Sequence, residues 1–318
     1  MSLHPASERA PPPPAKPAVS WIDLLQPTDE QKADVERQHG LKLPSREELS
    51  KVELSSRLAE RGGVLYLSMP TVSHLSGIDH APSPLGFVLS KDLLVTTRYA
   101  PLHSFETVAE RCSGGHRQFS SVETFVALVD EMVDLSADLF EEIASELDKV
   151  SRAVFSKLGR QQHVTQSNDE LRRILIRVGN AGERLSRIRD SVLGLQRIVP
   201  YVAGTEQDWI PVNIRARLRT TQGDLSSLAE YETHLYGKVQ FLLDAVLGFI
   251  NTKQNDIFQV LTVISIVGIP PTLVASIYGM NFRDMPELTW AWGYQYGLVL
   301  IVLSAILPIL WFKWRRWV

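Results

Sequence analysis

The sequence has little cysteine: Cys112 is the single thiol among 318 residues. One thiol excludes a framework of internal disulfides and is typical of a reducing compartment. Residues 1–17 are rich in proline and contain no long apolar stretch, so they predict a disordered tail rather than a secretory signal. The formal net charge is −3, and no nucleic-acid motif is present. A secreted disulfide scaffold and a nucleic-acid partner are therefore not expected.

The sequence also lacks enzyme signatures. It contains no nucleophile elbow, phosphate-binding glycine loop or zinc motif. His74, Asp79 and His80 are the only loosely clustered metal-ligand types in the first third, and such a cluster is more typical of a surface loop. We predict that the protein is not an enzyme and has no resident cofactor. A membrane-anchored enzyme and a non-conducting protein that tethers partners to the membrane remain alternatives.

Charge is absent from two stretches near the C-terminus, residues 257–278 and 294–312. Each is longer than the roughly 18 residues that mark a candidate transmembrane helix. A single stretch could be a buried core helix, but two in succession favour a membrane protein. We predict two spans over these residues, joined by an outer loop at 279–293.

Basic residues indicate the orientation of the spans. The second stretch is followed by Lys313, Arg315 and Arg316, whereas the outer loop contains one basic residue, Arg283. Lys and Arg accumulate on the cytoplasmic side. The basic tail at 313–318 is therefore predicted to be cytoplasmic, and two spans return the N-terminal part to the same side. We expect a multi-pass protein of the inner (plasma) membrane, in contact with lipid, with both termini in the cytoplasm.

The part before the spans divides into three predicted regions. Residues 18–118 mix helices with strands, including a strand at 63–68 and a hairpin at 86–99, and predict a cytoplasmic α/β domain of α/β/α type. Residues 119–207 are helical. Nine acidic residues lie between positions 123 and 148, and seven arginines lie between positions 171 and 198. These charges favour either an antiparallel hairpin of helices or two separately solvated faces.

A long helix follows, because no proline interrupts the chain between Pro211 and Pro270. Apolar residues recur at three- and four-residue steps, which predicts one helix of about 60 residues. Its first part, 208–256, would form a stalk that continues into the first span. We expect the apolar stripe to need partner helices and therefore self-association about a common axis. The stripe comprises Leu218, Leu225, Leu228, Leu235, Val239, Leu242, Val246 and Ile250.

The polar residues of the first span share one edge. At 100° per residue they fall within about a third of the helix circumference. Such an edge is expected to face either a neighbouring helix or a water-filled pore. Its members are Asn255, Gln259, Thr262, Ser265, Thr272 and Ser276.

The loop after this span contains neutral and acidic oxygen groups. Gly279 permits close backbone approach or a positive φ, and Asn281 offers a neutral carbonyl oxygen. Repeated about an axis, Asn281 would form an oxygen ring that hydrogen-bonds the water shell of magnesium, an ion that dehydrates reluctantly. Glu287 would be an acidic ring near the outer mouth or a solvated loop charge.

Residues 278–281 read Tyr-Gly-Met-Asn and residues 285–288 read Met-Pro-Glu-Leu; with a second span and a basic tail, they resemble the CorA family of magnesium channels. The resemblance implies an α+β membrane protein that forms a funnel-shaped homopentamer, with a stalk helix continuing into a pore-lining span. It assigns the selectivity filter to Gly279, Met280 and Asn281, with Asn281 holding a hydrated ion. Further pore positions on this basis are Asn255, Phe258, Leu261, Ser265, Ile269 and Thr272.

The sequence departs from the family pattern at two places. A doubled proline, Pro270 and Pro271, could kink the first span more strongly. At the stalk position where the family carries a regulatory magnesium site, Asp224 is the one acidic candidate. The predicted function is transport of magnesium, with cobalt as a second candidate ion. Zinc transport on the same scaffold remains an alternative.

Overall fold

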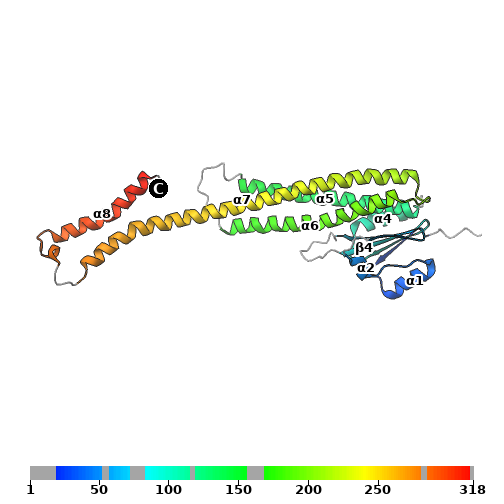
Figure 1. Cartoon of the computed structure of the whole chain (residues 1–318), viewed down its shortest axis with the longest axis horizontal. Helices are drawn as coiled ribbons and strands as arrows, with labels where there is room; N and C mark the ends of the chain where they lie inside the picture. The colour runs from blue at the N-terminus through cyan, green and yellow to red at the C-terminus, as the bar shows by residue number, and fades with distance from the viewer. Residues whose placement is uncertain are drawn as a thin grey trace, which may run out of the picture. The chain divides into compact units, whose positions relative to one another are not determined.

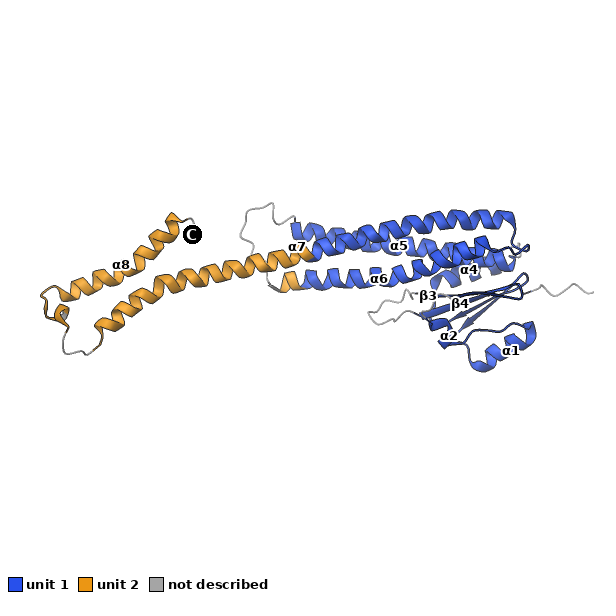
Figure 2. Cartoon of the chain, in the orientation of Figure 1, with its two compact units in different colours: residues 1–165, 173–243 blue, residues 166–172, 244–318 orange. Residues whose placement is uncertain are grey.

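The computed structural model describes residues 19–51, 57–71, 83–114, 119–155, 168–280 and 285–315. The chain forms two compact units (Figure 2), one of residues 1–165 and 173–243, the other of residues 166–172 and 244–318. The predicted tail at 1–17 lies outside the described residues, as do His74, Asp79, His80 and residues 316–318.

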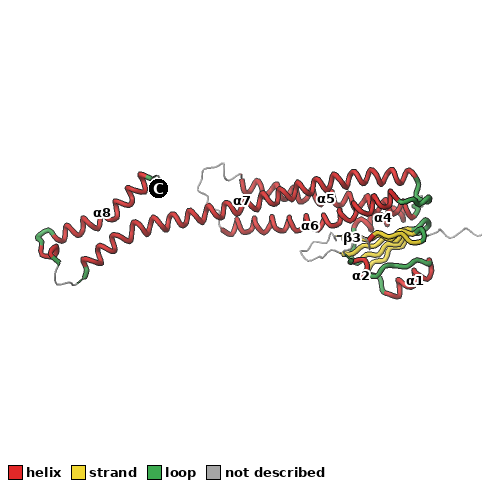
Figure 3. The backbone as a smooth tube through the Cα atoms, in the orientation of Figure 1, coloured by secondary structure: helices red, strands yellow, loops and turns green. Residues whose placement is uncertain are grey.

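The first unit contains one five-stranded sheet, shown in yellow in Figure 3. The strand order is β1-β5-β4-β3-β2, with β1 parallel to β5 and the other neighbours antiparallel. The strands at 63–68 and the hairpin at 86–99 are confirmed, whereas β2 has no counterpart in the sequence prediction. The bounds are β1 (Trp21–Leu25), β2 (Leu58–Arg61), β3 (Val64–Thr71), β4 (Ser83–Leu89) and β5 (Leu94–Arg98).

Two short helices cover one face of this sheet (Figure 1), and both begin with a capping box. In α1 (Asp29–His39) Thr28 and Gln31 form the box, and Gly40 ends the helix with a φ of 65°. In α2 (Arg46–Ser50) the capping box is formed by Ser45 and Glu48. Each box satisfies backbone N–H groups that the first helical turn leaves unpaired.

The opposite face of the sheet packs against helices, which completes the predicted α/β/α layering (Figure 1). These are α4 (His103–Gly114), α5 (Ser121–Phe155) and α6 (Asn168–Gly204). Phe87 of β4 meets Phe125 of α5 edge-to-face at a centroid distance of 5.4 Å. On α6, a Cβ added to Gly194 would lie 2.7 Å from Cβ of Met69 in β3, so α6 approaches β3 at a position that admits only glycine.

The predicted long helix is α7 (Val212–Tyr278), a continuous helix of 67 residues. Most of its apolar stripe is buried inside the single chain, with Leu218, Leu225 and Leu242 all 0% exposed, whereas Leu228 and Ile250 are half-buried. The hydroxyl of Thr221 donates to Asp130 of α5 at 2.8 Å, and Gln196 of α6 donates to the Leu225 carbonyl at 3.0 Å. The partner helices that this stripe was predicted to need are therefore present within the chain, and the buried stripe by itself gives no evidence for self-association. A helical period shows that a face is covered but does not identify the partner, and here α5 and α6 cover it.

The opposite charges of α5 and α6 pair across an antiparallel hairpin, which confirms that alternative. Arg184 of α6 lies 3.1 Å from Glu142 and 3.5 Å from Glu146, and Arg177 lies 3.6 Å from Glu146. Further acidic groups of α5 bind α7 instead, as in the 2.5 Å contact between Asp148 and Lys238.

Candidate ion-conduction pathway

The second unit contains two helices long and apolar enough to cross a membrane. They are the C-terminal part of α7 and α8 (Gly293–Trp314), each with a mean hydropathy of 2.1 over its most apolar window. None of that window in α7 and 6% of that in α8 is buried by the chain itself. Apolar helices left uncovered in this way need lipid or other protein around them.

The polar edge predicted from the sequence lies along α7. Asn255, Thr262, Thr272 and Ser276 are exposed in the single chain, and Ser265 is half-buried. The apolar candidates behave in the same way, because the exposed fractions of Phe258, Leu261 and Ile269 are 56%, 58% and 63%. These side chains are open to whatever surrounds the helix, and their assignment to a pore stays a prediction.

Two threonines on this edge engage their hydroxyl hydrogens within the helix. Thr262 Oγ1 donates to the Phe258 carbonyl at 2.7 Å, and Thr272 Oγ1 donates to the Gly268 carbonyl at 2.8 Å. A hydroxyl has one hydrogen and two lone pairs. Each oxygen can therefore only accept further hydrogen bonds. The water molecules that surround a cation point their hydrogens outward, so acceptors of this kind suit a hydrated cation.

The doubled proline leaves two carbonyls of α7 without helical donors. Pro270 and Pro271 have no N–H group, so the carbonyls of Ile266 and Val267, four residues earlier, receive no helical hydrogen bond. The helix nevertheless continues through both prolines to Tyr278. From the sequence, the doubled proline predicted a stronger kink. The two free carbonyls follow from the same residues, because any proline inside a helix removes the donor for the residue four positions before it.

The first residues of the predicted filter directly follow the C-terminal end of α7. Gly279 N–H donates to the Ala275 carbonyl at 3.0 Å, and a Cβ at Gly279 would lie 3.2 Å from that same oxygen. Gly279 is not among the described glycines with positive φ. Gly279 was predicted to permit either a close backbone approach or a positive φ, and the structure shows the close approach. Met280 is exposed, and Asn281 lies outside the described residues.

The segment before α8 carries Glu287 within a short 3₁₀ helix, η1 (Pro286–Thr289). Glu287 is half-buried. A Cβ added to Gly293 would lie 2.1 Å from the Glu287 carbonyl oxygen, so glycine is required at the start of α8. The rings of Trp290 and Tyr296 also meet at 5.9 Å. These contacts hold the backbone of Glu287 against the first turn of α8.

The predicted regulatory residue, Asp224, lies on an exposed part of α7. Over the ranges that the structure describes, no group of three or more His, Cys, Asp or Glu side chains could hold a metal ion. The described single chain thus supplies no complete metal site around Asp224.

Residues 17–315 match the family described as CorA-like Mg2+ transporter protein. The chain belongs to this family. The magnesium transport proteins CorA of Salmonella typhimurium and Escherichia coli are each 31% identical to it over 299 residues, which is 93% of this chain and 91% of theirs. The CorA-family fold covers the α/β domain, the long helices and both spans, as predicted.

Solved structures show the same fold at low sequence identity. The complete CorA magnesium transporter from Methanocaldococcus jannaschii aligns with a TM-score of 0.74 at 16% identity, over 94% of this chain and 91% of that one. The full-length CmaX protein gives 0.68 at 18% identity, over 93% and 88%. The cytoplasmic domain of ZntB from Vibrio parahaemolyticus gives 0.55 at 11% identity, over 73% and 88%. Membership of the CorA-like Mg2+ transporter family, rather than these structural likenesses, identifies the chain as a transporter-type membrane protein and not an enzyme.

Proposed function

We propose that this protein conducts hydrated magnesium across the inner (plasma) membrane, with cobalt as a second passenger. The observation that carries the proposal is the polar edge of α7, which runs along an apolar span that the described chain leaves uncovered. A polar edge in hydrocarbon is unfavourable, so it needs protein or water beside it. Family membership favours water, because a transporter requires a polar route through the bilayer.

The proposed pathway forms when five copies place this edge around a shared axis. Magnesium gives up its water slowly, so the ion would pass with its water shell largely in place. Thr262 and Thr272 would accept hydrogen bonds from that shell, because their own hydrogens are already donated to Phe258 and Gly268. Contacts through water bind an ion weakly enough for release, which conduction requires.

Selection would occur at the mouth, where Gly279, Met280 and Asn281 follow the span. The neutral carbonyl oxygen of Asn281 would face the hydrated ion, and the close backbone approach at Gly279 would keep the turn narrow. Glu287 would raise the local cation concentration before selection. In this proposal the carboxylate of Glu287 attracts any cation, whereas the filter residues contact the water shell of the ion.

Apolar positions on the same side of α7 would close the pathway. Phe258, Leu261 and Ile269 are all more than half exposed in the single chain. Rings of such side chains around a narrow axis exclude water and so block ions. Asn255, just before this region, would present an amide at the cytoplasmic end.

Flux measurement in proteoliposomes tests the proposal. Purified protein would be reconstituted, and uptake of magnesium, cobalt and zinc compared with and without a proton gradient. Asn281→Ala should abolish magnesium uptake while native mass spectrometry still shows pentamers. Asn213→Ala, an exposed amide at the start of α7, is the matched control and should conduct normally.

Each other outcome has a defined meaning. Undiminished magnesium flux through Asn281→Ala would remove that residue from the filter. Zinc flux in preference to magnesium would replace the proposed ion, and absence of flux for all three ions would favour a non-conducting protein.

A further inference from the structure

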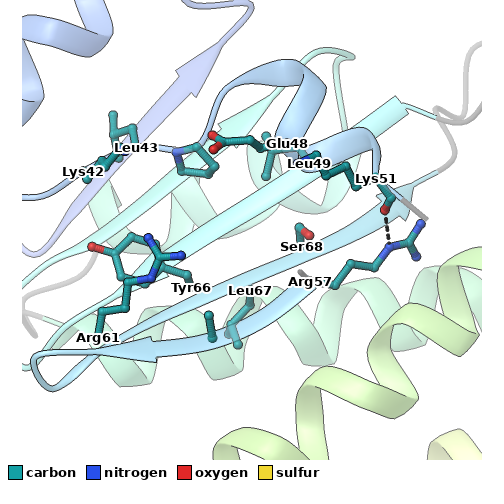
Figure 4. A pocket seen from close by; sticks show the side chains of 12 residues that line it. Lys42, Leu43, Glu48, Leu49, Lys51, Arg57, Arg61, Tyr66, Leu67 and Ser68 are labelled. Atoms are coloured by element: carbon teal, nitrogen blue, oxygen red, sulfur yellow. Dashed lines mark hydrogen bonds between the residues drawn. The ribbon is translucent and has the colours of Figure 1, made fainter. Parts of the chain in front are cut away.

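A cavity of about 200 Å³ lies between α2 and the β2–β3 edge of the sheet (Figure 4). Four basic side chains line it: Lys42 and Lys51 flank α2, Arg57 precedes β2, and Arg61 ends β2. The cavity belongs wholly to the first unit, away from the two spans in sequence. The proposed conduction pathway uses none of these residues.

The cavity contains a buried hydroxyl with no partner. Ser68 of β3 lines it and is only 7% exposed. Among the described side chains, its Oγ is the one buried polar atom without a hydrogen bond. A buried hydroxyl left unpaired costs stability, and in native proteins such groups usually meet water or a ligand. The Ser68 hydroxyl is therefore available to hydrogen-bond a group that enters the cavity.

Packing beside Ser68 fixes this arrangement. Ser68 pairs in register with Gly86 of β4. A Cβ at Gly86 would lie 2.6 Å from Cδ2 of Leu49, so the Leu49 side chain of α2 rests directly on the sheet there. Leu49 is 3% exposed. The apolar contact anchors α2 over the strands and gives the cavity a fixed wall.

The charge of the lining is predominantly positive. Among the described lining residues, Glu48 is the one carboxylate against four basic groups. It accepts a hydrogen bond from the Ser45 N–H at 2.8 Å, and this bond, with the Ser45 hydroxyl and the charges of Lys42 and Lys51, holds the pKa of Glu48 below its usual value. Glu48 is thus engaged in capping α2. The four basic side chains therefore give the described lining of the cavity an excess of positive charge.

Both arginines are held in place but keep donors for a ligand. Arg57 Nε donates to the Lys51 carbonyl at 2.8 Å, and the Arg61 guanidinium lies 5.8 Å from the centroid of the Tyr66 ring. A guanidinium has five N–H donors, so a single backbone bond or a ring contact does not exhaust it. Fixed guanidinium groups with further donors are suited to phosphate oxygens.

We infer that this cavity binds a small soluble phosphorylated ligand, a phosphate monoester or polyphosphate. Its phosphate oxygens would accept hydrogen bonds from Ser68 Oγ and from Lys51 and Arg57. Four basic groups match a multiply charged anion better than the singly charged phosphodiester of a lipid headgroup. The cavity is smaller than those that enclose a drug-sized molecule, so it would hold the phosphate end, and the remainder of the ligand would extend into solvent.

Calorimetry and thermal-shift measurements on the full-length protein in detergent test the inference. The probes are inorganic phosphate, pyrophosphate, ATP, adenosine and glycerophosphoglycerol, all with EDTA so that magnesium does not contribute. Pyrophosphate and ATP should bind more tightly than phosphate, and adenosine should not bind. Lys51→Gln and Arg57→Gln should each weaken ATP binding about tenfold. Lys91→Gln removes an exposed lysine from the β4–β5 turn and should leave ATP binding unchanged.

Ser68→Ala separates a ligand contact from a purely structural role. Without ligand the variant should be at least as stable as the natural protein, because it loses an unpaired buried hydroxyl. With ATP its thermal shift should be smaller. The inference is overturned if no phosphate compound binds, or if the Lys51, Arg57 and Ser68 variants all bind ATP normally. Equal binding of glycerophosphoglycerol and ATP would assign the cavity to a lipid headgroup and overturn the soluble ligand.

Discussion

Arg98 and Asp23 form a forked ion pair that joins β5 to β1. Arg98 Nη2 lies 2.9 Å and Nε 3.0 Å from Asp23 Oδ2. The Thr96 hydroxyl donates to the other carboxylate oxygen at 2.8 Å and accepts from Trp21 Nε1 at 3.0 Å. The Arg98 side chain is 8% exposed and that of Asp23 is 22% exposed. One carboxylate thus fixes the N-terminal strand to the sheet.

Removal of Asp23 should destabilise the α/β domain. Asp23→Ala leaves the Arg98 guanidinium largely buried and unpaired, a change that typically costs about 3 kcal/mol. Chemical denaturation of the purified protein, followed by tryptophan fluorescence, measures the loss. Asp92→Ala, in an exposed turn, is the control. Equal stability of the two variants would show that the ion pair contributes little.

Two glycines of α6 should respond in opposite directions to the same substitution. Gly194→Ala places a Cβ 2.7 Å from Cβ of Met69, which forces α6 away from β3 and should lower the melting temperature. Gly179→Ala meets no atom within 4 Å and should stabilise the helix by about 0.5–1 kcal/mol. Differential scanning calorimetry compares them. A stabilising Gly194→Ala would show that α6 and β3 are free to separate.

The length of α7 could be predicted from the sequence, but the helices that pack against it could not. The absence of proline and the regular steps from Leu218 to Ile250 predicted α7. The same steps did not reveal that α5 and α6 of one chain cover Leu242, because periodicity describes a face and not its neighbour. Strand β2 was missed since Leu58–Arg61 is short and half charged.

The pore candidates were predicted as a set on one helix, and the structure places them there. What surrounds Thr272 depends on other copies and on lipid, which one chain cannot supply. Ser68 gave no signal in the sequence, because its isolation arises only when α2 packs over β3. Tertiary packing, rather than any local pattern, creates that cavity.

The hydroxyl of Thr272 should contribute to ion passage. Thr272→Val keeps the side-chain shape and removes the oxygen, so magnesium flux in proteoliposomes should fall about tenfold, as expected for loss of an acceptor for bound water. Ser304→Ala removes a hydroxyl from α8, where it donates to the Ile301 carbonyl, and should leave flux unchanged. Equal fluxes for the two variants would place Thr272 outside the pathway.

The contact between Asp148 and Lys238 should make stability depend on pH. The Lys238 hydrogen bond, followed by its charge and that of Arg152, lowers the pKa of Asp148. A lowered carboxyl pKa adds stability above the usual value of about 3.9, and this contribution is lost as the pH falls through the lowered pKa. At pH 7, Asp148→Asn should therefore lower the melting temperature slightly, as for other exposed pairs.

A double-mutant cycle isolates this pair. The difference in melting temperature between the natural protein and the Asp148→Asn variant should shrink toward zero as the pH falls below the usual carboxyl range. It should also disappear at pH 7 in a Lys238→Met background. Persistence of the difference without Lys238 would assign the effect to Asp148 alone.

The parallel pairing of β1 with β5 has a consequence for biosynthesis. Trp21 and Thr96 bond across a separation of 75 residues, so the first strand made by the ribosome has no partner until the fifth has emerged. Long-range strand pairing is slow, and domains tend to fold during synthesis from the N-terminus. Residues 94–98 are translated well before residue 257, so we expect translation to give the sheet time to close before the first hydrophobic segment reaches the insertion machinery.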